Sequence, residues 1–265
     1  MTTRSQNTDI AVDGSHLAGT VLAPGSTIPG VLFIHGWGGC QERDLGRAQQ
    51  IAALGCICLT FDMRGHMRTE ALRQTVTREQ NLADAVAAYD HLRAQPHVDP
   101  DAILVVGASY GGYLAAILSS LRPVKWLALR VPALYRDQDW DAPKRSLSRK
   151  VLDDYRSRVL EPDDNRALRA CRDFTGDVLI VESGHDHLVP HPAIVSYRNA
   201  LRHTHSVTYR IIDQADHALS SPDCQQAYTS MLLSWTTEMV FGARAGGAPG
   251  QAPPRPGAAH QAAHL

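Results

Sequence analysis

The sequence predicts an α/β fold in which helices cover both faces of a mostly parallel β-sheet. Strand-like and helix-like segments alternate from about residue 30 to residue 241, and such alternation builds βαβ units around a parallel sheet. The strand-like segments VLFI and AILVV are continuously apolar, as expected for strands buried on both faces. The chain of 265 residues, 44% of them hydrophobic, can bury a core of the required size.

The chain opens with a predicted β-hairpin. The segments DIAV and HLAGTVLAP flank Asp13 and Gly14, and Asp-Gly between two apolar strands favours a tight turn. The next apolar run, VLFIH, follows a turn region from Pro24 to Pro29 and ends in HGWGG. We expect this run to be the first central strand of the sheet.

The alternating segments carry recognisable helix starts. Residues 77–80 read TREQ, which has the form of a capping box, and Ser221 followed by Pro222 favours the start of the last helix. In chain order we expect a helix from about Glu42 to Leu54, the strand CICLTF, a helix after Thr77, the strand AILVVG, a helix after Ser109, the strand KWLAL, the strand DVLIVES, a helix near Ala193 to Leu201, the strand VTYRII and a final helix to about Phe241.

Two stretches depart from this alternation. Residues 131–175 are rich in charge, and we interpret them as a small helical insertion, or cap, over the carboxyl edge of the sheet. Residues 242–265 are mainly Ala, Gly and Pro with almost no large apolar side chains, a composition typical of a disordered tail. The sequence therefore predicts a single α/β domain over residues 1–241.

Composition argues against several classes of partner. The net charge of -1 comes from 26 basic and 27 acidic residues without a run of Lys and Arg, so nucleic acid is not an expected partner. The polar start MTTRSQNTDI lacks the apolar core of a secretion signal, and no run of about 18 apolar residues could span a bilayer. We expect a cytoplasmic protein without a membrane partner. Five scattered cysteines make a disulfide framework improbable, and alternation within the strand places Cys56 and Cys58 on one sheet face as buried thiols.

Ser109 is the candidate nucleophile. Residues 107–111 read GASYG, which has the form G-x-S-x-G, directly after a predicted strand and before a predicted helix. The serine of such an elbow sits in a strained backbone conformation that exposes its hydroxyl, and glycine on either side leaves room for the turn. The following helix directs free N–H groups at the substrate oxygen, so the Tyr110 N–H is the first expected oxyanion donor.

A serine hydroxyl needs a base, and His217 is the best placed candidate. It follows the last predicted strand, on a loop that can reach back over the carboxyl edge of the sheet, and histidine titrates near neutral pH. The rival residues His203 and His205 precede that strand and are expected at the opposite edge.

Asp186 is the preferred acid for orienting the histidine. It lies just after the strand DVLIV, at the same predicted edge as Ser109 and His217. Asp213 and Asp216 are the alternatives. Asp216 is adjacent to His217 in sequence, which makes a good bond to the ring nitrogen awkward, whereas Asp213 at a strand end stays possible.

The order Ser109, Asp186, His217 is the order used by α/β-hydrolases, and the sequence resembles that superfamily over about residues 10 to 241. The similar segments are the oxyanion loop HGWGG, the fourth-strand turn FDMRGH, the elbow GASYGG, the acid turn SGHDHLVP and the histidine loop ADHAL. The resemblance implies the α/β-hydrolase fold, with a mostly parallel eight-stranded sheet and a small helical cap. It implies no cofactor.

The resemblance also implies roles for the residues around the nucleophile. The backbone N–H of Trp37 would be the second oxyanion donor, and His35 would brace its loop. Arg64, Gly65 and His66 are similar to a family turn that usually continues with glycine, where this chain has Met67. We interpret His66 as structural.

The most similar subgroups are the dienelactone-hydrolase-like and acyl-peptidase-like esterases. A true dienelactone hydrolase has a cysteine nucleophile, which Ser109 replaces, and the peptidases usually carry an N-terminal propeller, for which we expect no room here. Both departures favour a stand-alone serine esterase that cleaves a small carboxylic ester through an acyl-enzyme. An amidase, peptidase or thioesterase with the same triad is the alternative. A non-catalytic binding protein on this scaffold would be expected to lack a triad member.

Substrate-binding and metal-binding residues are less clearly marked. Tyr135 and Trp140 in the predicted insertion are candidates for lining the substrate pocket, although aromatic residues there could equally serve packing. His185, His187 and His191 surround the proposed acid, but their spacing fits no common zinc pattern. We predict no metal site.

Overall fold

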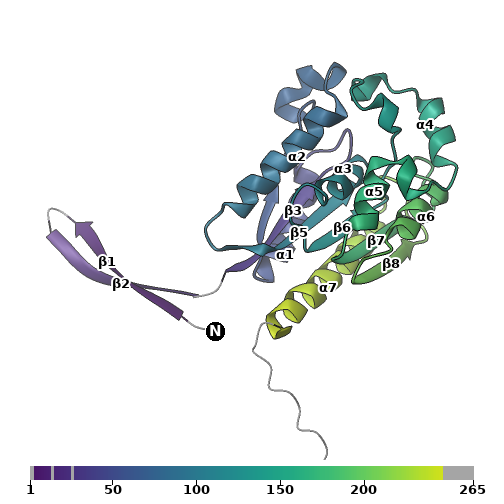
Figure 1. The fold of residues 1–265 in the computed structure, drawn as a ribbon. Coiled ribbons are helices and arrows are strands. Elements are labelled where there is room, and N and C mark those ends of the chain that lie inside the picture. Colours follow the sequence, from purple (N-terminus) through teal and green to yellow (C-terminus); the bar gives the residue numbers. More distant parts are fainter. Residues whose placement is uncertain (1–2, 13–14, 25–26, 247–265) are drawn as a thin grey trace, which may run out of the picture.

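The computed structural model describes residues 3–12, 15–24 and 27–246. Its centre is a six-stranded sheet in which every neighbouring pair is parallel, in the order β4-β3-β5-β6-β7-β8 (Figure 1). The strands are β3 Ile28–Ile34, β4 Ile57–Thr60, β5 Val98–Ala108, β6 Trp126–Arg130, β7 Asp177–Ser183 and β8 Ser206–Ile212. Each of these strands was predicted from its apolar run, and the mostly parallel α/β class is confirmed.

The predicted N-terminal hairpin is present as β1 (Thr3–Val12) and β2 (Ser15–Pro24), which pair antiparallel with each other. The expected turn residues Asp13 and Gly14 lie outside the described residues. Within the described part of the chain the hairpin forms a two-stranded sheet of its own. The main sheet therefore has six strands, and the expected number of eight is wrong. A hairpin can satisfy its ladder internally, so the strand pattern does not reveal whether it joins a larger sheet.

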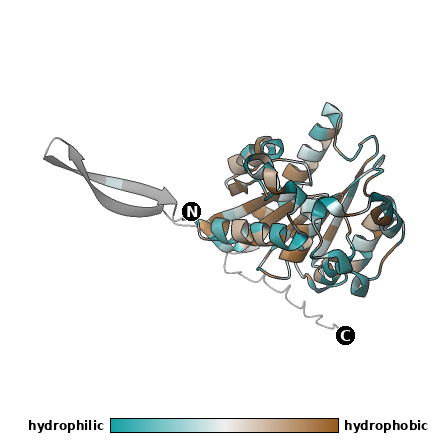
Figure 2. Ribbon diagram, turned by 90° about the horizontal axis from the view of Figure 1, so that it is seen from above, coloured by the Kyte–Doolittle hydropathy of each residue, from teal (hydrophilic) through white to brown (hydrophobic). Residues whose placement is uncertain are grey.

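Helices cover both faces of the sheet and bury two apolar clusters. One cluster packs α1 and α7 against the strands through residues such as Ile51 and Leu232, and the other packs α2, α3, α5 and α6 through residues such as Tyr89 and Leu114. Figure 2 shows the hydrophobic residues gathered in the central strands. The helices are α1 Glu42–Ala53, α2 Arg78–Arg93, α3 Tyr110–Leu118, α4 Arg149–Arg156, α5 Arg166–Asp173, α6 His191–Ala200 and α7 Pro222–Gly246.

Local sequence signals correctly predicted where α2 and α7 begin. The capping box of α2 is formed, because the Gln80 N–H donates to the Thr77 hydroxyl at 3.2 Å while the Thr77 N–H donates to Gln80 Oε1 at 3.0 Å. Helix α7 begins at Pro222 as predicted, but it continues to Gly246. Its predicted end near Phe241 is too early, because alanine and arginine are good helix formers and extend the helix into the start of the polar tail. Residues 247–265, expected to be disordered, lie outside the described residues.

Residues 131–175 hold short helical segments between β6 and β7. These are the 3-10 turns Asp137–Asp139, Lys144–Ser146 and Pro162–Asp164, together with α4 and α5. Helix α5 packs against α3 and α6, and α4 contacts the turn after Asp186, where Arg156 Nη1 donates to the Leu188 carbonyl oxygen at 2.9 Å. The 3-10 turn at Lys144 is attached to the segment before α2, where the Lys144 N–H donates to the Val76 carbonyl oxygen at 2.8 Å.

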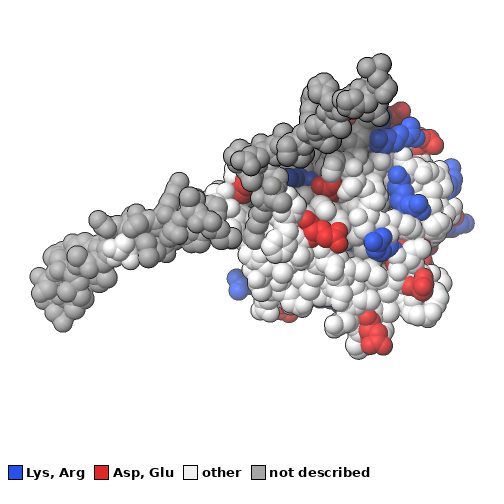
Figure 3. Space-filling model, turned by 90° about the horizontal axis from the view of Figure 1, so that it is seen from below, with Lys and Arg blue, Asp and Glu red and all other residues white. Residues whose placement is uncertain are grey.

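The distribution of surface charge and the positions of Cys56 and Cys58 follow the sequence composition. On the face shown in Figure 3, basic and acidic side chains are interspersed. Among the described helices, none combines the length and the apolar character that crossing a bilayer requires. Cys56 and Cys58 both contact the cluster between the sheet and helices α1 and α7, as the strand alternation predicts.

Candidate active site

The strand-to-helix turn at Ser109 has the strained geometry that the sequence predicts. Strand β5 ends at Ala108, α3 begins at Tyr110, and Ser109 between them has φ +53° and ψ -114°, a region that residues with a side chain rarely occupy. The close approach requires glycine at both flanks. A Cβ on Gly107 would lie 2.5 Å from the Gly111 carbonyl oxygen, and one on Gly111 would lie 2.0 Å from the Ile34 carbonyl oxygen.

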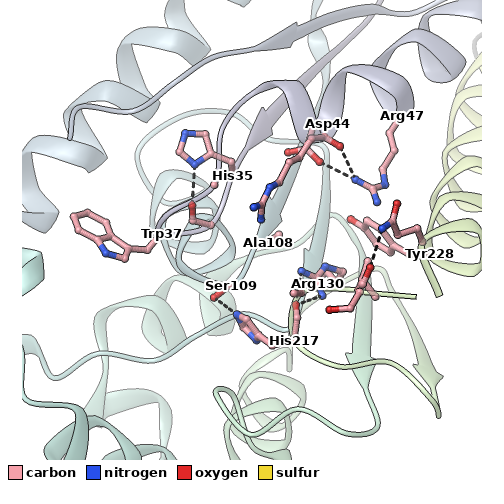
Figure 4. Close-up of a pocket in the computed structure, with 16 residues that line it drawn as sticks. His35, Trp37, Asp44, Arg47, Ala108, Ser109, Arg130, His217 and Tyr228 are labelled. Atoms are coloured by element: carbon pink, nitrogen blue, oxygen red, sulfur yellow. Dashed lines mark hydrogen bonds and ion pairs between the residues drawn. The ribbon is translucent and has the colours of Figure 1, made fainter. Parts of the chain in front are cut away.

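The structure brings Ser109, His217 and Asp186 together at the carboxyl edge of the sheet. The Ser109 Oγ lies 3.0 Å from His217 Nε2 (Figure 4), and His217 Nδ1 lies 2.6 Å from Asp186 Oδ2. Each residue follows a different strand: Ser109 follows β5, Asp186 follows β7 and His217 follows β8. The continuous hydrogen-bond chain has the geometry required for moving a proton from the serine hydroxyl to the imidazole.

The Asp186 carboxylate is held as an anion inside the protein. Its side chain is 1% exposed, and its second oxygen accepts the backbone N–H groups of Leu188 at 2.7 Å and Val189 at 2.9 Å. Burial alone would raise the pKa of this carboxyl. The hydrogen bond and charge of His217 and the two backbone donors outweigh burial and hold the pKa below its usual range. A carboxylate of this kind fixes the proton on the Nδ1 atom of His217.

The alternative acids and bases lie elsewhere. Asp216 accepts the N–H and the hydroxyl of Ser220, at 2.8 and 2.6 Å, so its carboxylate stabilises the turn after His217. The backbone of Asp213 packs against Gly184. His205 bonds Asp177, the first residue of β7, at 2.6 Å. His203 and His205 thus precede β8 at the amino edge, as predicted.

Two neutral imidazoles support the loop that contains Trp37. His35 Nδ1 donates to the Gly36 carbonyl oxygen at 2.8 Å, and His35 Nε2 accepts the Met63 N–H at 3.2 Å. His66 Nε2 accepts the Gly38 N–H at 3.0 Å. Because each ring accepts a backbone N–H, both rings are neutral, and burial lowers the pKa of both. His66 has the structural position that we predict for it.

The two expected oxyanion donors have no hydrogen-bond acceptor among the described residues. Within the described residues, neither the Trp37 N–H nor the Tyr110 N–H donates a hydrogen bond. A Cβ on Gly36 would lie 3.4 Å from the Ser109 Cβ, so the loop before Trp37 passes directly beside the nucleophile. Both amides are therefore candidates for binding an oxyanion formed at Ser109.

A cavity of about 580 Å³ lies beside Ser109 and His217 (Figure 4). Sequence reasoning did not name several polar residues of its wall, among them Arg43, Asp44, Arg47, Arg130 and Tyr228. Arg130 had a detectable signal, because it is a charged residue ending an otherwise apolar strand, at the sheet edge where ligands bind in parallel α/β proteins. The others project from α1 and α7 and had no local signal.

Tyr135 and Trp140 lie outside the residues that line this cavity. They belong to a group of aromatic and basic side chains on the other side of the Trp37 loop, which we call the cap-side cluster. Its members are Trp37, Arg78, Tyr110, Tyr135, Trp140, Lys144 and Arg156. In Figure 4 the Trp37 ring points away from Arg130 and Tyr228, and its contacts with Tyr110 and Lys144 connect it to this cluster. The substrate-binding roles of Tyr135 and Trp140 stay predictions.

The histidines near Asp186 do not gather around one point. His191 bonds Glu182 at 2.8 Å, and the His187 carbonyl oxygen accepts from Arg149 at 3.5 Å. In the described parts of the chain, no group of three or more His, Cys, Asp or Glu side chains is arranged to hold a metal ion.

Comparisons with known proteins place this arrangement in a family. The chain is similar to solved structures of a dienelactone hydrolase from Anabaena variabilis (TM-score 0.56, 20% identity, 88% of this chain and 96% of that chain) and of the esterase domain of a Rhodothermus marinus protein (TM-score 0.56, 20% identity, 89% and 99%). At such identities the likeness shows the α/β-hydrolase fold.

Sequence relatives and a family model are more specific. An uncharacterized protein of Mycobacterium tuberculosis is 31% identical over 183 residues, which are 67% of this chain and 60% of the relative. The chain thus spans about 60% of the length of that relative. The model of the prolyl oligopeptidase family matches residues 43–242, a range that includes Ser109, Asp186 and His217. The chain has the α/β-hydrolase fold and belongs to the prolyl oligopeptidase family.

Proposed function

We propose that this chain is a serine hydrolase that cleaves carboxylic esters through an acyl-enzyme, with Ser109 as nucleophile, His217 as general base and Asp186 as the residue that orients His217. The hydrogen-bond chain from Asp186 through His217 to Ser109, beside an open cavity, carries the proposal. The esterase and dienelactone hydrolase among its structural neighbours favour an ester substrate.

The proposed reaction has two halves. The Ser109 Oγ attacks the carbonyl carbon while His217 Nε2 takes its proton, and the N–H groups of Trp37 and Tyr110 stabilise the negative charge that forms on the carbonyl oxygen. The intermediate then expels the alcohol, which receives the proton from His217. In the second half His217 deprotonates a water molecule, which attacks the acyl-enzyme and releases the carboxylic acid and the free serine.

Labelling and kinetics of one serine variant test the proposal. Ser109→Ala should abolish labelling by a fluorophosphonate probe and lower kcat for p-nitrophenyl butyrate by roughly 10³-fold or more. Ser120→Ala, which changes a serine that caps the end of α3, should keep both. Full labelling and turnover in Ser109→Ala would reject the assignment of the nucleophile.

A peptidase or amidase with the same three residues is the second candidate, because the family is named for a peptidase. An ester and an anilide with the same acyl group, such as an N-acylated amino acid, would separate the two. Higher kcat/KM for the anilide than for the ester would favour the peptidase and overturn the ester preference.

A further inference from the structure

The cavity beside Ser109 has an excess of positive charge. Three arginines and one aspartate line it, namely Arg43, Arg47, Arg130 and Asp44. Asp44 forms an ion pair with Arg47, whose Nη1 lies 3.1 Å from the Asp44 carboxylate. Burial raises the pKa of Asp44. In the described part of the chain, Arg43 and Arg130 then have no carboxylate of their own.

Arg130 is a buried cation whose positive charge is not neutralised by contact with an acid. Its side chain is almost entirely buried, and Nη1 and Nη2 each donate to the His217 carbonyl oxygen at 3.0 Å. Among the described residues no carboxylate lies within ion-pair distance of it, and Asp186 and Asp44 act on it only from farther away. Two of the five guanidinium donors are used, so the remaining donors can bind a ligand.

Arg43 adds a second cation on the wall formed by α1. Its side chain has no hydrogen-bond or ion-pair partner among the described residues, although its backbone carbonyl oxygen accepts from Arg47 at 3.0 Å. A guanidinium that lines a cavity and has no protein acceptor is available for an anion. Figure 4 shows Arg130 next to His217, on the wall of the same cavity as Ser109.

We propose that the substrate carries a carboxylate near its scissile ester bond, and that Arg130 and Arg43 bind this carboxylate. The inference rests on the proposed esterase function and names its substrate class. Guanidinium groups match the planar geometry of carboxylates, and the cavity is of a size typical for small ligands.

Matched esters test the proposal on the full chain. The first pair is mono-p-nitrophenyl adipate and its methyl ester, which place a charged or neutral end on the acyl side. The second pair is 4-acetoxybenzoate and its methyl ester, which place the charge on the alcohol side. After correction for uncatalysed hydrolysis, kcat/KM for the charged ester should exceed that for its neutral partner by about tenfold in at least one pair.

Variants of Arg43 connect this preference to the cavity. Arg43→Gln should lower the charged-to-neutral ratio of kcat/KM by about tenfold, whereas Arg43→Lys should retain part of it because the positive charge remains. Arg93→Gln is the matched control: it removes one positive charge from an exposed position at the end of α2, outside the cavity. It should leave the ratio unchanged.

The possible outcomes separate the two proposals. Hydrolysis of the neutral esters with no preference for either charged ester overturns the carboxylate site and leaves the esterase. An Arg43→Gln ratio equal to that of the wild type also overturns it. If neither ester is hydrolysed and Ser109 is not labelled by fluorophosphonate, the proposed function itself fails.

Discussion

The two sides of the Trp37 loop both hold arginine or lysine next to aromatic rings, but they use these residues differently. On one side Arg130 and Tyr228 line a cavity of about 580 Å³. On the other, in the cap-side cluster, Lys144 Nζ lies 4.8 Å from the centre of the Trp37 ring and 4.9 Å from that of Tyr135. Arg78 is completely buried there, and its Nε and Nη2 have no hydrogen-bond partner among the residues that the structure describes.

The difference indicates which side can receive a substrate. Cations of the cap-side cluster face aromatic rings, which compensate part of their charge in place, and the cluster helps attach the 3-10 turn at Lys144 to the segment before α2. Arg47 and Arg130 also lie over an aromatic ring, that of Tyr228, at 4.9 and 5.7 Å, but together with Arg43 they line the cavity. Tyr135 and Trp140 contact buried cations in this structure, and their substrate-binding roles stay predictions, whereas Arg43 and Arg130 line the cavity.

The largest expected effect concerns the acid at the edge of the cavity. Asp186→Asn should lower kcat by roughly 10³ to 10⁴-fold, because an amide cannot stabilise the His217 imidazolium and favours the wrong tautomer. Steady-state hydrolysis of p-nitrophenyl butyrate measures it. Asp216→Asn is the control, since Asp216 bonds Ser220. Normal activity of Asp186→Asn with loss in Asp213→Asn would show that the acid is misassigned.

The second prediction concerns the close packing of the strand-to-helix turn at Ser109. Gly111→Ala should lower the free energy of unfolding by about 3 kcal/mol, since its Cβ would meet the Ile34 carbonyl oxygen at 2.0 Å. Urea denaturation measures it. Gly46→Ala, where a Cβ on helix α1 meets nothing within 4 Å, should instead raise the unfolding free energy by roughly 0.5 to 1 kcal/mol. Equal effects of the two substitutions would contradict the close packing at the elbow.

The smallest effect is a pH dependence from the cap-side cluster. Burial lowers the pKa of Lys144. Burial alone would raise the pKa of Tyr135, but Lys144 and Arg156 outweigh it and lower that pKa. At alkaline pH the unfolded chain therefore binds more protons at both groups than the folded chain, so their contribution to stability rises as pH approaches the ordinary values of 10.0 and 10.5.

Removing the lysine tests this sign. The unfolding free energy of the wild type minus that of Lys144→Met should increase between about pH 8 and pH 10, measured by denaturant titration at each pH. Lys150→Met, at an exposed position of α4, should show no such trend. A difference that stays flat or decreases with pH would mean that Lys144 is not buried beside Tyr135 in solution.

Much of the fold could be predicted because its signals are local. Apolar runs together with the alternation of strand-like and helix-like segments identified all six strands of the parallel sheet, and TREQ identified the start of α2. The predictions were wrong where the outcome depends on more than the local sequence pattern. The hairpin residues have the pattern of strands, but this pattern does not indicate whether the hairpin joins the main sheet. The end of α7 depends on how far good helix formers can extend a helix beyond its packed part.

The candidate site was predictable to the extent that its residues follow strands. Ser109, Asp186 and His217 each come after a strand of one parallel sheet, and parallel strands end at the same edge. The cavity wall was largely missed, because Arg43, Arg47 and Tyr228 lie on helices and their direction depends on how α1 and α7 pack. Tyr135, a candidate for lining the substrate pocket, lies outside the residues that line the cavity, and its neighbours Lys144 and Arg156 were not foreseen.

The sequence by itself determined the strands, the tight turn at residue 109 and the order in which the three reactive side chains appear, since each depends on a few neighbouring residues. Only the tertiary structure decided which cations pair with a carboxylate and which line the cavity without one. That distinction depends on distances between side chains far apart in the chain, and packing sets those distances.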